Sequence, residues 1–212
     1  MLQGQTESNI TSLNFSIAKG KAIDAIVQFI ESSLPGFISD LSTGLKNEDD
    51  ISQECCIYLN RAAQNQFFMF HFQHKYVGSK RSSDFSIIST QQFSSKEPLF
   101  VIEAKRLPTP GTGREREYVQ GNLGAIERFK RGLHGKGLSR SAIIGYVQKE
   151  SFEHWLNQIT IWINDLIKTN ADTSVVWTNS DHLKLISNGK YFSKHTRSDE
   201  KDIELNHYWL KV

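Results

Sequence analysis

Cysteine and proline are scarce in this chain, which has 212 residues but two cysteines and four prolines. The two cysteines are the adjacent Cys55 and Cys56, and adjacent cysteines do not normally form a structural disulfide. Two cysteines also cannot make a zinc set, so the sequence predicts neither a disulfide framework nor a zinc site. Both lie in an apolar helical stretch, which indicates core thiols in a reducing compartment.

Long apolar runs and a marked excess of one charge are also lacking. No apolar run approaches the ~20 residues that a membrane helix requires. The N-terminal segment 1–8 has neither the basic nor the apolar region of a signal peptide. We therefore expect a soluble, cytoplasmic protein that does not bind membranes. The 25 basic and 23 acidic residues give a formal charge of +2, so overall charge says little about partners.

Length and composition predict one domain over residues 1–212 with a substantial core, because 38% of the residues are hydrophobic and 23% are charged. Residues 1–16 are polar and are expected to be irregular or loosely strand-like. Helical spacing predicts helices at 19–34, which Pro35-Gly36 should end, and at 47–65, 115–133 and 151–166. Strand patterns predict strands at 67–76, 84–90, 98–106 and 141–147, then shorter ones near 174–178, 183–187, 190–194 and 203–211. Short connections favour an antiparallel meander for the first three.

Three charged residues fall within or beside predicted strands. Asp84 lies near the start of the second strand, and Glu103 and Lys105 lie in the apolar strand Leu99–Lys105. Because Glu103 and Lys105 are two positions apart, a strand projects both from the same face. Charges in an apolar strand are costly unless something pairs with them. A divalent cation and a reacting phosphate are partners that would explain both charges.

This pattern resembles the PD-(D/E)XK nuclease superfamily, which has the restriction-endonuclease-like fold. The resemblance covers residues 48–147: an acidic helix start, Asp84 on a strand, Glu103-x-Lys105 on the next strand, and then a basic helix. Ser83 stands where the eponymous proline would be, at a position that varies within the superfamily. The resemblance implies an α/β fold whose core, at about 47–147, has the order α-β-β-β-α-β. A central mixed sheet would be flanked by helices, with N-terminal helical and C-terminal helix and strand additions.

The resemblance also implies a function. It indicates a metal-dependent nuclease that hydrolyses phosphodiester bonds in nucleic acid, with DNA favoured by superfamily habit, in restriction, defence or repair. Mg²⁺ or Mn²⁺ would be held by Asp84, Glu103 and the carbonyl oxygen of Ala104. The cation would polarise the scissile phosphate and lower the pKa of a bound water, which Lys105 would orient or activate. Such enzymes often form homodimers, although the sequence shows no dimer face.

Two further residues are candidates for this site. A carboxylate often lies on the first core helix of the superfamily, and Glu48 is our first choice because it stands near the helix start. Glu54, about two turns further on, is the alternative. Gln120, on the predicted helix after Lys105, could hydrogen-bond the water or a phosphate.

Basic residues crowd into the stretch from Lys105 to Arg140. This local excess is what a phosphate-binding groove needs, although a solvated basic helix face is the alternative. The arginines expected to contact nucleic acid are Arg106, Arg114, Arg116, Arg128 and Arg131.

Other interpretations remain open at this point. The chain could be a non-catalytic, nuclease-like subunit that binds nucleic acid or serves an assembly, or an interaction protein that uses the aromatic run 67–70. Glu103 and Lys105 could also be a surface ion pair on an edge strand. A kinase is excluded because no glycine-rich loop precedes the lysine. The histidines show no metal-ligand spacing, and His71 and His74 should point to opposite faces of their strand.

Overall fold

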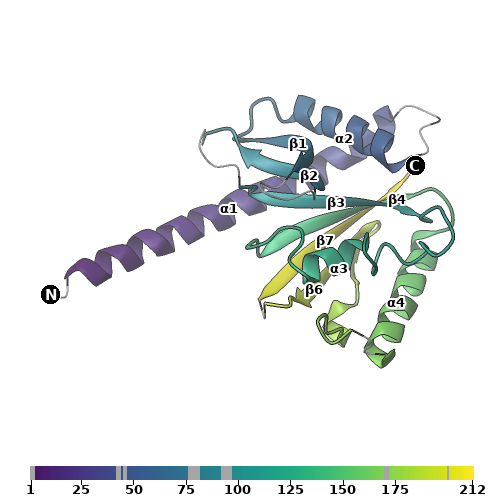
Figure 1. Ribbon diagram of the computed structural model, residues 1–212. Helices are drawn as coiled ribbons and strands as arrows, with labels where there is room; N and C mark the ends of the chain where they lie inside the picture. The colour runs from purple at the N-terminus through teal and green to yellow at the C-terminus, as the bar shows by residue number, and fades with distance from the viewer. Residues whose placement is uncertain are drawn as a thin grey trace.

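A seven-stranded mixed sheet forms the centre of the fold in the computed structural model (Figure 1). The structure describes residues 3–41, 44, 47–75, 82–91, 97–169, 172–199 and 201–212, with side chains from Lys19 onward. The strands are β1 (Phe68–Lys75), β2 (Ser82–Ser89), β3 (Phe100–Leu107), β4 (Arg140–Val147), β5 (Lys184–Ser187), β6 (Lys190–Thr196) and β7 (Asp202–Lys211). The helices are α1 (Gln3–Asp40), α2 (Glu48–Ala62), α3 (Ala125–Lys130), α4 (Phe152–Thr169) and the short 3-10 helix η1 (Asn179–Asp181).

The strand order is β1-β2-β3-β4-β7-β6-β5. The pairs β3–β4 and β4–β7 are parallel, and the other neighbours are antiparallel. The predicted α/β class, the mixed sheet and the antiparallel meander of the first three strands are therefore confirmed. Because β3 lies inside the sheet and Glu103 is only 1% exposed, the alternative of a surface ion pair on an edge strand is wrong.

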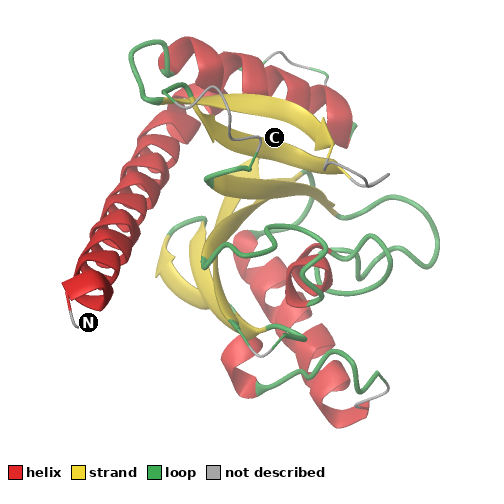
Figure 2. Ribbon diagram, turned by 60° about the vertical axis from the view of Figure 1, so that its left-hand side comes forward, coloured by secondary structure: helices red, strands yellow, loops and turns green. Residues whose placement is uncertain are grey.

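Helices cover both faces of the sheet (Figure 2). Side chains from α1 and α2 pack with Phe85, Ile102 and Ala104 in one apolar cluster. Side chains from α3 and α4 pack with Val101 and Ile143 in a second cluster. Since side chains alternate along a strand, residues of β3 at odd numbers face the second cluster. This alternation places Glu103 and Lys105 on the face that α3 covers.

The start of α2 follows from its local sequence. The side chain of Asn47 caps the helix by accepting a hydrogen bond from the N–H of Asp50 at 2.7 Å. Three carboxylates in the first turn, Glu48, Asp49 and Asp50, suit the positive end of the helix dipole. The cap fixes where the helix begins, and so fixes the position of Glu48.

Helix α1 is longer at both ends than the sequence predicts. It begins at Gln3, although residues 1–16 show no apolar periodicity, and it continues past Pro35 to Asp40. Pro35 is exposed, whereas Phe37, in the following turn, is buried in the core. Burial of Phe37 offsets the one backbone hydrogen bond that proline removes, so the helix does not end where it was expected to.

The predicted helix at 115–133 is largely wrong, because only α3 is helical there. Gly121 has a φ of 101°, which a right-handed helix does not allow. A side chain at Gly124 would meet the carbonyl carbon of Gln120 at 2.3 Å, so the chain folds back tightly at this point. Leu123 consequently faces solvent, 42% exposed, and does not join the core.

Two further expectations fail in the described residues. Residues 174–178 form no strand, although Val175 and Trp177 are buried and Val176 is exposed as in a strand. The rings of His71 and His74 lie edge to face with centroids 5.2 Å apart, so these side chains do not point to opposite faces. Between them Gln73 has a φ of 48°, which interrupts the alternation. Residues 76–81, between β1 and β2, lie outside the described residues.

Within the described part of the chain, no helix has both the length and the apolar character of a membrane-spanning segment.

Candidate active site

The two carboxylates singled out in the sequence lie side by side on one face of the sheet. The pairing of β2 with β3 places Phe85 opposite Ile102, and its continuation by one residue places Asp84 opposite Glu103. Asp84 also reaches the backbone of the next strand, because its Oδ2 accepts a hydrogen bond from the N–H of Ala104 at 2.7 Å. The location of both carboxylates therefore follows from the strand register.

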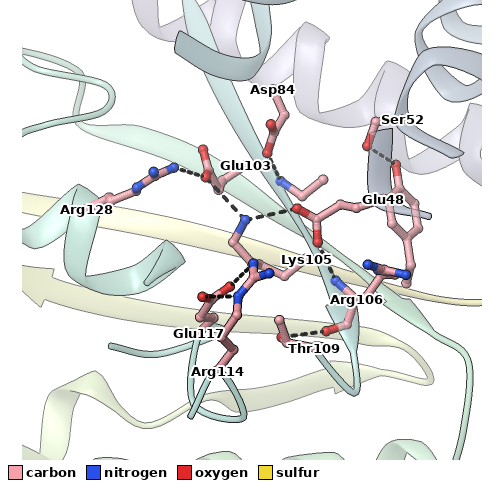
Figure 3. A network of polar contacts seen from close by, with 12 residues as sticks. Glu48, Ser52, Asp84, Glu103, Lys105, Arg106, Thr109, Arg114, Glu117 and Arg128 are labelled. Carbon is pink, nitrogen blue, oxygen red and sulfur yellow. Dashed lines mark hydrogen bonds and ion pairs between the residues drawn. The ribbon is translucent and has the colours of Figure 1, made fainter. Parts of the chain in front are cut away.

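Lys105 joins this pair to the start of α2 (Figure 3). Its Nζ donates a hydrogen bond to Oε1 of Glu48 at 3.1 Å and lies 3.5 Å from Oε1 of Glu103. Oε2 of Glu48 accepts a hydrogen bond from the N–H of Arg106 at 2.8 Å, which holds the helix start against β3. Of the two alternatives for the helix carboxylate, Glu48 reaches the site, whereas Glu54 is exposed to solvent.

Glu103 is surrounded by donors. Arg128, on α3, donates a hydrogen bond from Nη1 to Oε1 of Glu103 at 2.6 Å. Nδ1 of His134 lies 2.9 Å from Oε2 of Glu103, although this buried oxygen has no well-aligned hydrogen bond. With Lys105, three nitrogen-bearing side chains stand against one carboxylate that is almost fully buried.

The neighbouring carboxylates Asp84 and Glu103 have opposite pKa shifts. Burial raises the pKa of Asp84 to about 8, and the charge of Glu103 adds to this effect while Lys105 opposes it. Burial also disfavours ionisation of Glu103, but Lys105, His134 and Arg128 outweigh it and lower its pKa to about 2. Burial works against the charge of Lys105, yet the surrounding carboxylates raise its pKa. At neutral pH, Glu103 is ionised, Lys105 holds its proton and Asp84 is largely neutral.

These side chains line a pocket of ≈ 400 Å³ that contains four carboxylates. The carboxylates are Glu48, Asp49, Asp84 and Glu103. Lys105 lies among them, and Arg114, Arg128 and His134 also line the pocket. The site is therefore rich in acceptors, and two of its cationic groups, those of Lys105 and Arg128, lie close to Glu103.

Most of the predicted phosphate-binding arginines are paired with acids. Four of them make ion pairs with carboxylates: Arg114 with Glu117, Arg116 with Asp165, Arg128 with Glu103, and Arg131 with Glu127 and Asp172. Arg106 supplies its backbone N–H to the site. Of these arginines, Arg114 and Arg128 line the pocket.

Gln120 lies outside this pocket. It lines a neighbouring depression, of ≈ 690 Å³, that shares Arg114, Asn122 and Leu123 with the site. The tight turn at Gly121 and Gly124 replaces the expected helix. The side chain of Gln120 therefore does not face the carboxylates, as it would have done on that helix. Its proposed hydrogen bond to water or phosphate at this site is not supported by the geometry.

Two residues of the pocket, His134 and Gln73, were not predicted from the sequence. His134 follows α3 in a basic loop, with no partner at recognisable spacing, and only the fold brings it to Glu103. Gln73 lines the pocket from β1, and nothing in the strand pattern distinguishes it. The cross-strand position of Gln73, opposite Asp84, could have been found only with the register of β1 and β2 in hand.

A second polar cluster lies in the other half of the sheet. The Oγ of Ser193 is 2.6 Å from Nε2 of His195, whose Nδ1 is 2.5 Å from Oδ1 of Asp181. This order matches a hydrolytic triad, but Ser193 and His195 have no exposed surface, so no substrate reaches them. Asp181 also accepts a hydrogen bond from the buried Lys130 of α3 at 2.6 Å. This cluster attaches α3 to the sheet and is not an active site.

Hard divalent cations prefer oxygen ligands, and the acidic wall of the pocket offers them. The buried Oε2 of Glu103 and the raised pKa of Asp84 both indicate carboxylates that a cation would stabilise. Among the described residues, however, no three ligand side chains already surround one point. Instead, Arg128 and Lys105 form ion pairs with Oε1 of Glu103. The residues fit a cation, provided that Arg128 moves off Oε1 of Glu103.

Comparison of the chain with protein-family models, with curated proteins and with solved structures finds no match. The function of the protein is therefore inferred from the residues of the site.

Proposed function

We propose that this protein is a metal-dependent nuclease that hydrolyses phosphodiester bonds in DNA. The observation that carries the proposal is the convergence of Glu48, Asp84, Glu103 and Lys105, from α2, β2 and β3, in one pocket. The element order α2-β1-β2-β3-α3-β4 also agrees with the α-β-β-β-α-β order that a restriction-endonuclease-like core requires.

Each residue has a role that its surroundings support. Asp84 and Glu103 would hold Mg²⁺ or Mn²⁺, with the carbonyl oxygen of Ala104 as a further ligand. When bound, the cation supplies positive charge at the scissile phosphate and lowers the pKa of a coordinated water. Lys105 keeps its proton, so it donates to the oxygen on which negative charge develops and does not act as a base. Glu48 fixes the direction of the Lys105 ammonium group.

One observation favours a second function, that of a non-catalytic subunit that binds nucleic acid. Lys105 and Arg128 already compensate the charge of Glu103, and the ring of His134 lies against its other oxygen. A pocket that had lost its catalytic role could retain this arrangement for structural reasons.

Cleavage assays separate the two functions. Plasmid, linear, single-stranded and branched DNA are incubated with the purified protein in Mg²⁺, in Mn²⁺ and in chelator. We expect cleavage with either metal and none in chelator, and we expect Lys105→Ala and Asp84→Asn to abolish it. Lys184→Ala, an exposed position on β5 outside the pocket, is the matched control and should cut like the wild type. DNA binding without cleavage under every metal condition would favour the non-catalytic function.

A further inference from the structure

The edge strand β1 places a glutamine with an uncommon backbone conformation at the wall of the candidate site. Gln73 has a φ of 48°, in the left-handed region that residues with a side chain seldom occupy. Glycine would adopt this conformation at lower cost, yet the chain has a glutamine here. The side chain is exposed and lines the same pocket as Asp84, Glu103 and Lys105.

The sheet register gives Gln73 a defined position in the site. On either side of it, Phe72 is opposite Phe85 and His74 is opposite Ser83, so Gln73 stands opposite Asp84. No regular ladder pair is formed at this point. Because Asp84 is in turn opposite Glu103, the three residues make one row across β1, β2 and β3. Gln73 is the outermost member, next to the edge of the sheet.

The chemistry of the pocket differs between its two sides. Lys105, Arg128 and His134 all lie against Glu103, on the side toward α3. On the side toward β1, the lining carries Asp84, the hydroxyl of Ser82 and the neutral amide of Gln73. None of the described lining side chains from β1 and β2 is cationic, so a nucleic-acid phosphate that enters on this side needs a neutral donor. The carboxamide of Gln73 has two N–H donors at its end.

We propose that Gln73 is a substrate-binding residue whose side-chain amide donates a hydrogen bond to a phosphate oxygen of the bound nucleic acid, at the β1 side of the site. This inference rests on the proposed function, because it assigns the phosphate of the same substrate. The left-handed backbone at Gln73 costs conformational free energy, and in this role it directs the side-chain amide into the pocket.

The proposal distinguishes phosphate binding from two other roles. A residue that serves only the fold should not weaken DNA binding when glycine replaces it, since glycine suits a φ of 48°. A residue that ligates the cation should tolerate Gln73→Glu, because a carboxylate is the better ligand for a hard cation. A phosphate donor should lose function in both variants, and more in Gln73→Glu, whose negative charge repels the phosphate.

The test measures binding of a fluorescent DNA duplex by anisotropy in Mg²⁺. All variants carry Lys105→Ala so that the probe stays intact. We expect Gln73→Gly to fold at least as stably as its parent and to bind about tenfold more weakly, the loss typical of a hydrogen bond to a charged group. The dependence of the affinity on salt should keep its slope, because a neutral amide displaces no counterion. Gln73→Glu should bind more weakly still.

Two controls match these changes. Among the described residues, Glu150 is exposed and shares the left-handed backbone of Gln73, with a φ of 60°, and Glu150→Gly should leave binding unchanged. Gln53→Glu adds the same charge at an exposed position of α2 outside the pocket. Parental affinity in Gln73→Gly would overturn the assignment of Gln73 but leave the nuclease proposal standing if the chain with Lys105 intact cuts DNA. Failure of the parent to bind any duplex, together with no cleavage of DNA by the chain with Lys105 intact, would overturn both.

Discussion

The raised pKa of Asp84 predicts that one carboxylate costs the metal-free protein stability at neutral and alkaline pH. Its pKa is about 8 in the folded protein, against an ordinary value of 3.8. Between these values the folded state holds a proton that the unfolded state has released, so the stability of the fold should decrease as the pH rises from about 4 to about 8. Asp84→Asn removes this titration and keeps an oxygen that accepts the hydrogen bond from Ala104. The variant should therefore be the more stable protein at pH 8 in chelator.

The size of the effect follows from the shift. About four pKa units correspond to an upper limit of ~6 kcal/mol, at 1.36 kcal/mol for each unit. Asp84 is only partly buried and solvent relaxes around it, so we expect ~1–3 kcal/mol, or roughly 3–10 °C in the melting temperature of a chain of this length. Thermal unfolding of both proteins at pH 5, 6.5 and 8 in chelator measures this difference.

Adding Mg²⁺ should reverse the order of stability. The wild type should be stabilised in proportion to the logarithm of the metal concentration, whereas Asp84→Asn should gain less because an amide is a poorer ligand. Asp40→Asn, at the exposed end of α1, should change neither response. Parallel pH curves for wild type and Asp84→Asn in chelator would refute the reasoning about burial. Equal stabilisation by Mg²⁺ would refute the assignment of Asp84 as a ligand.

Three further outcomes follow from the ion pairs. Arg128→Ala should tighten Mn²⁺ binding several-fold in calorimetry, because Oε1 of Glu103 is freed, and an unchanged affinity would show that the arginine does not compete with the cation. Asp181→Asn should destabilise the fold by ~3–5 kcal/mol at pH 7, since Lys130 is left buried and unpaired. Because the pKa of Asp181 is lowered in the folded protein, the wild type should lose this advantage in stability as the pH falls below about 4. Urea denaturation of both proteins at pH 7 and pH 3 would detect the difference. Arg116→Ala should lower the salt slope of duplex binding by about 0.9 and change stability by less than ~1 kcal/mol, and an unchanged slope would limit this arginine to its pair with Asp165.

The elements that the sequence predicted well are those specified by local patterns. The continuous apolar run before Glu103 predicted an interior strand, and β3 is buried on both faces as such runs require. A two-residue spacing placed Glu103 and Lys105 on one face, and Asn47 with the carboxylates after it marked the start of α2. Short connections predict that β1, β2 and β3 pair in order. The proximity of Asp84 to Glu103 could therefore also be predicted from the sequence.

The elements that failed depend on contacts distant in sequence or on single backbone angles. Pro35 was expected to stop α1, but packing of the next turn into the core decided otherwise. The helix predicted after β3 does not form around Gly121 and Gly124, because the chain turns tightly there. Only the folded structure shows this turn. His134 contacts Glu103, which lies 31 residues earlier in the sequence, and no sequence motif indicates this contact. The left-handed backbone at Gln73 has no signature in the residues around it.

The contrast between the two carboxylates of the site depends on the side chains beside Glu103, and α3 supplies one of them. Asp84 and Glu103 occupy equivalent, neighbouring positions in the sheet, yet one pKa is about 8 and the other about 2. The pKa of Glu103 is lowered first by Lys105, then by His134 and by Arg128, which reaches Glu103 from α3. The same helix is held at its far end by the ion pair of Lys130 with Asp181, deep in the second half of the sheet. Loss of that buried ion pair should therefore also affect Glu103. A shift of α3 would move Arg128 away from the carboxylate, which would then bind a cation more readily.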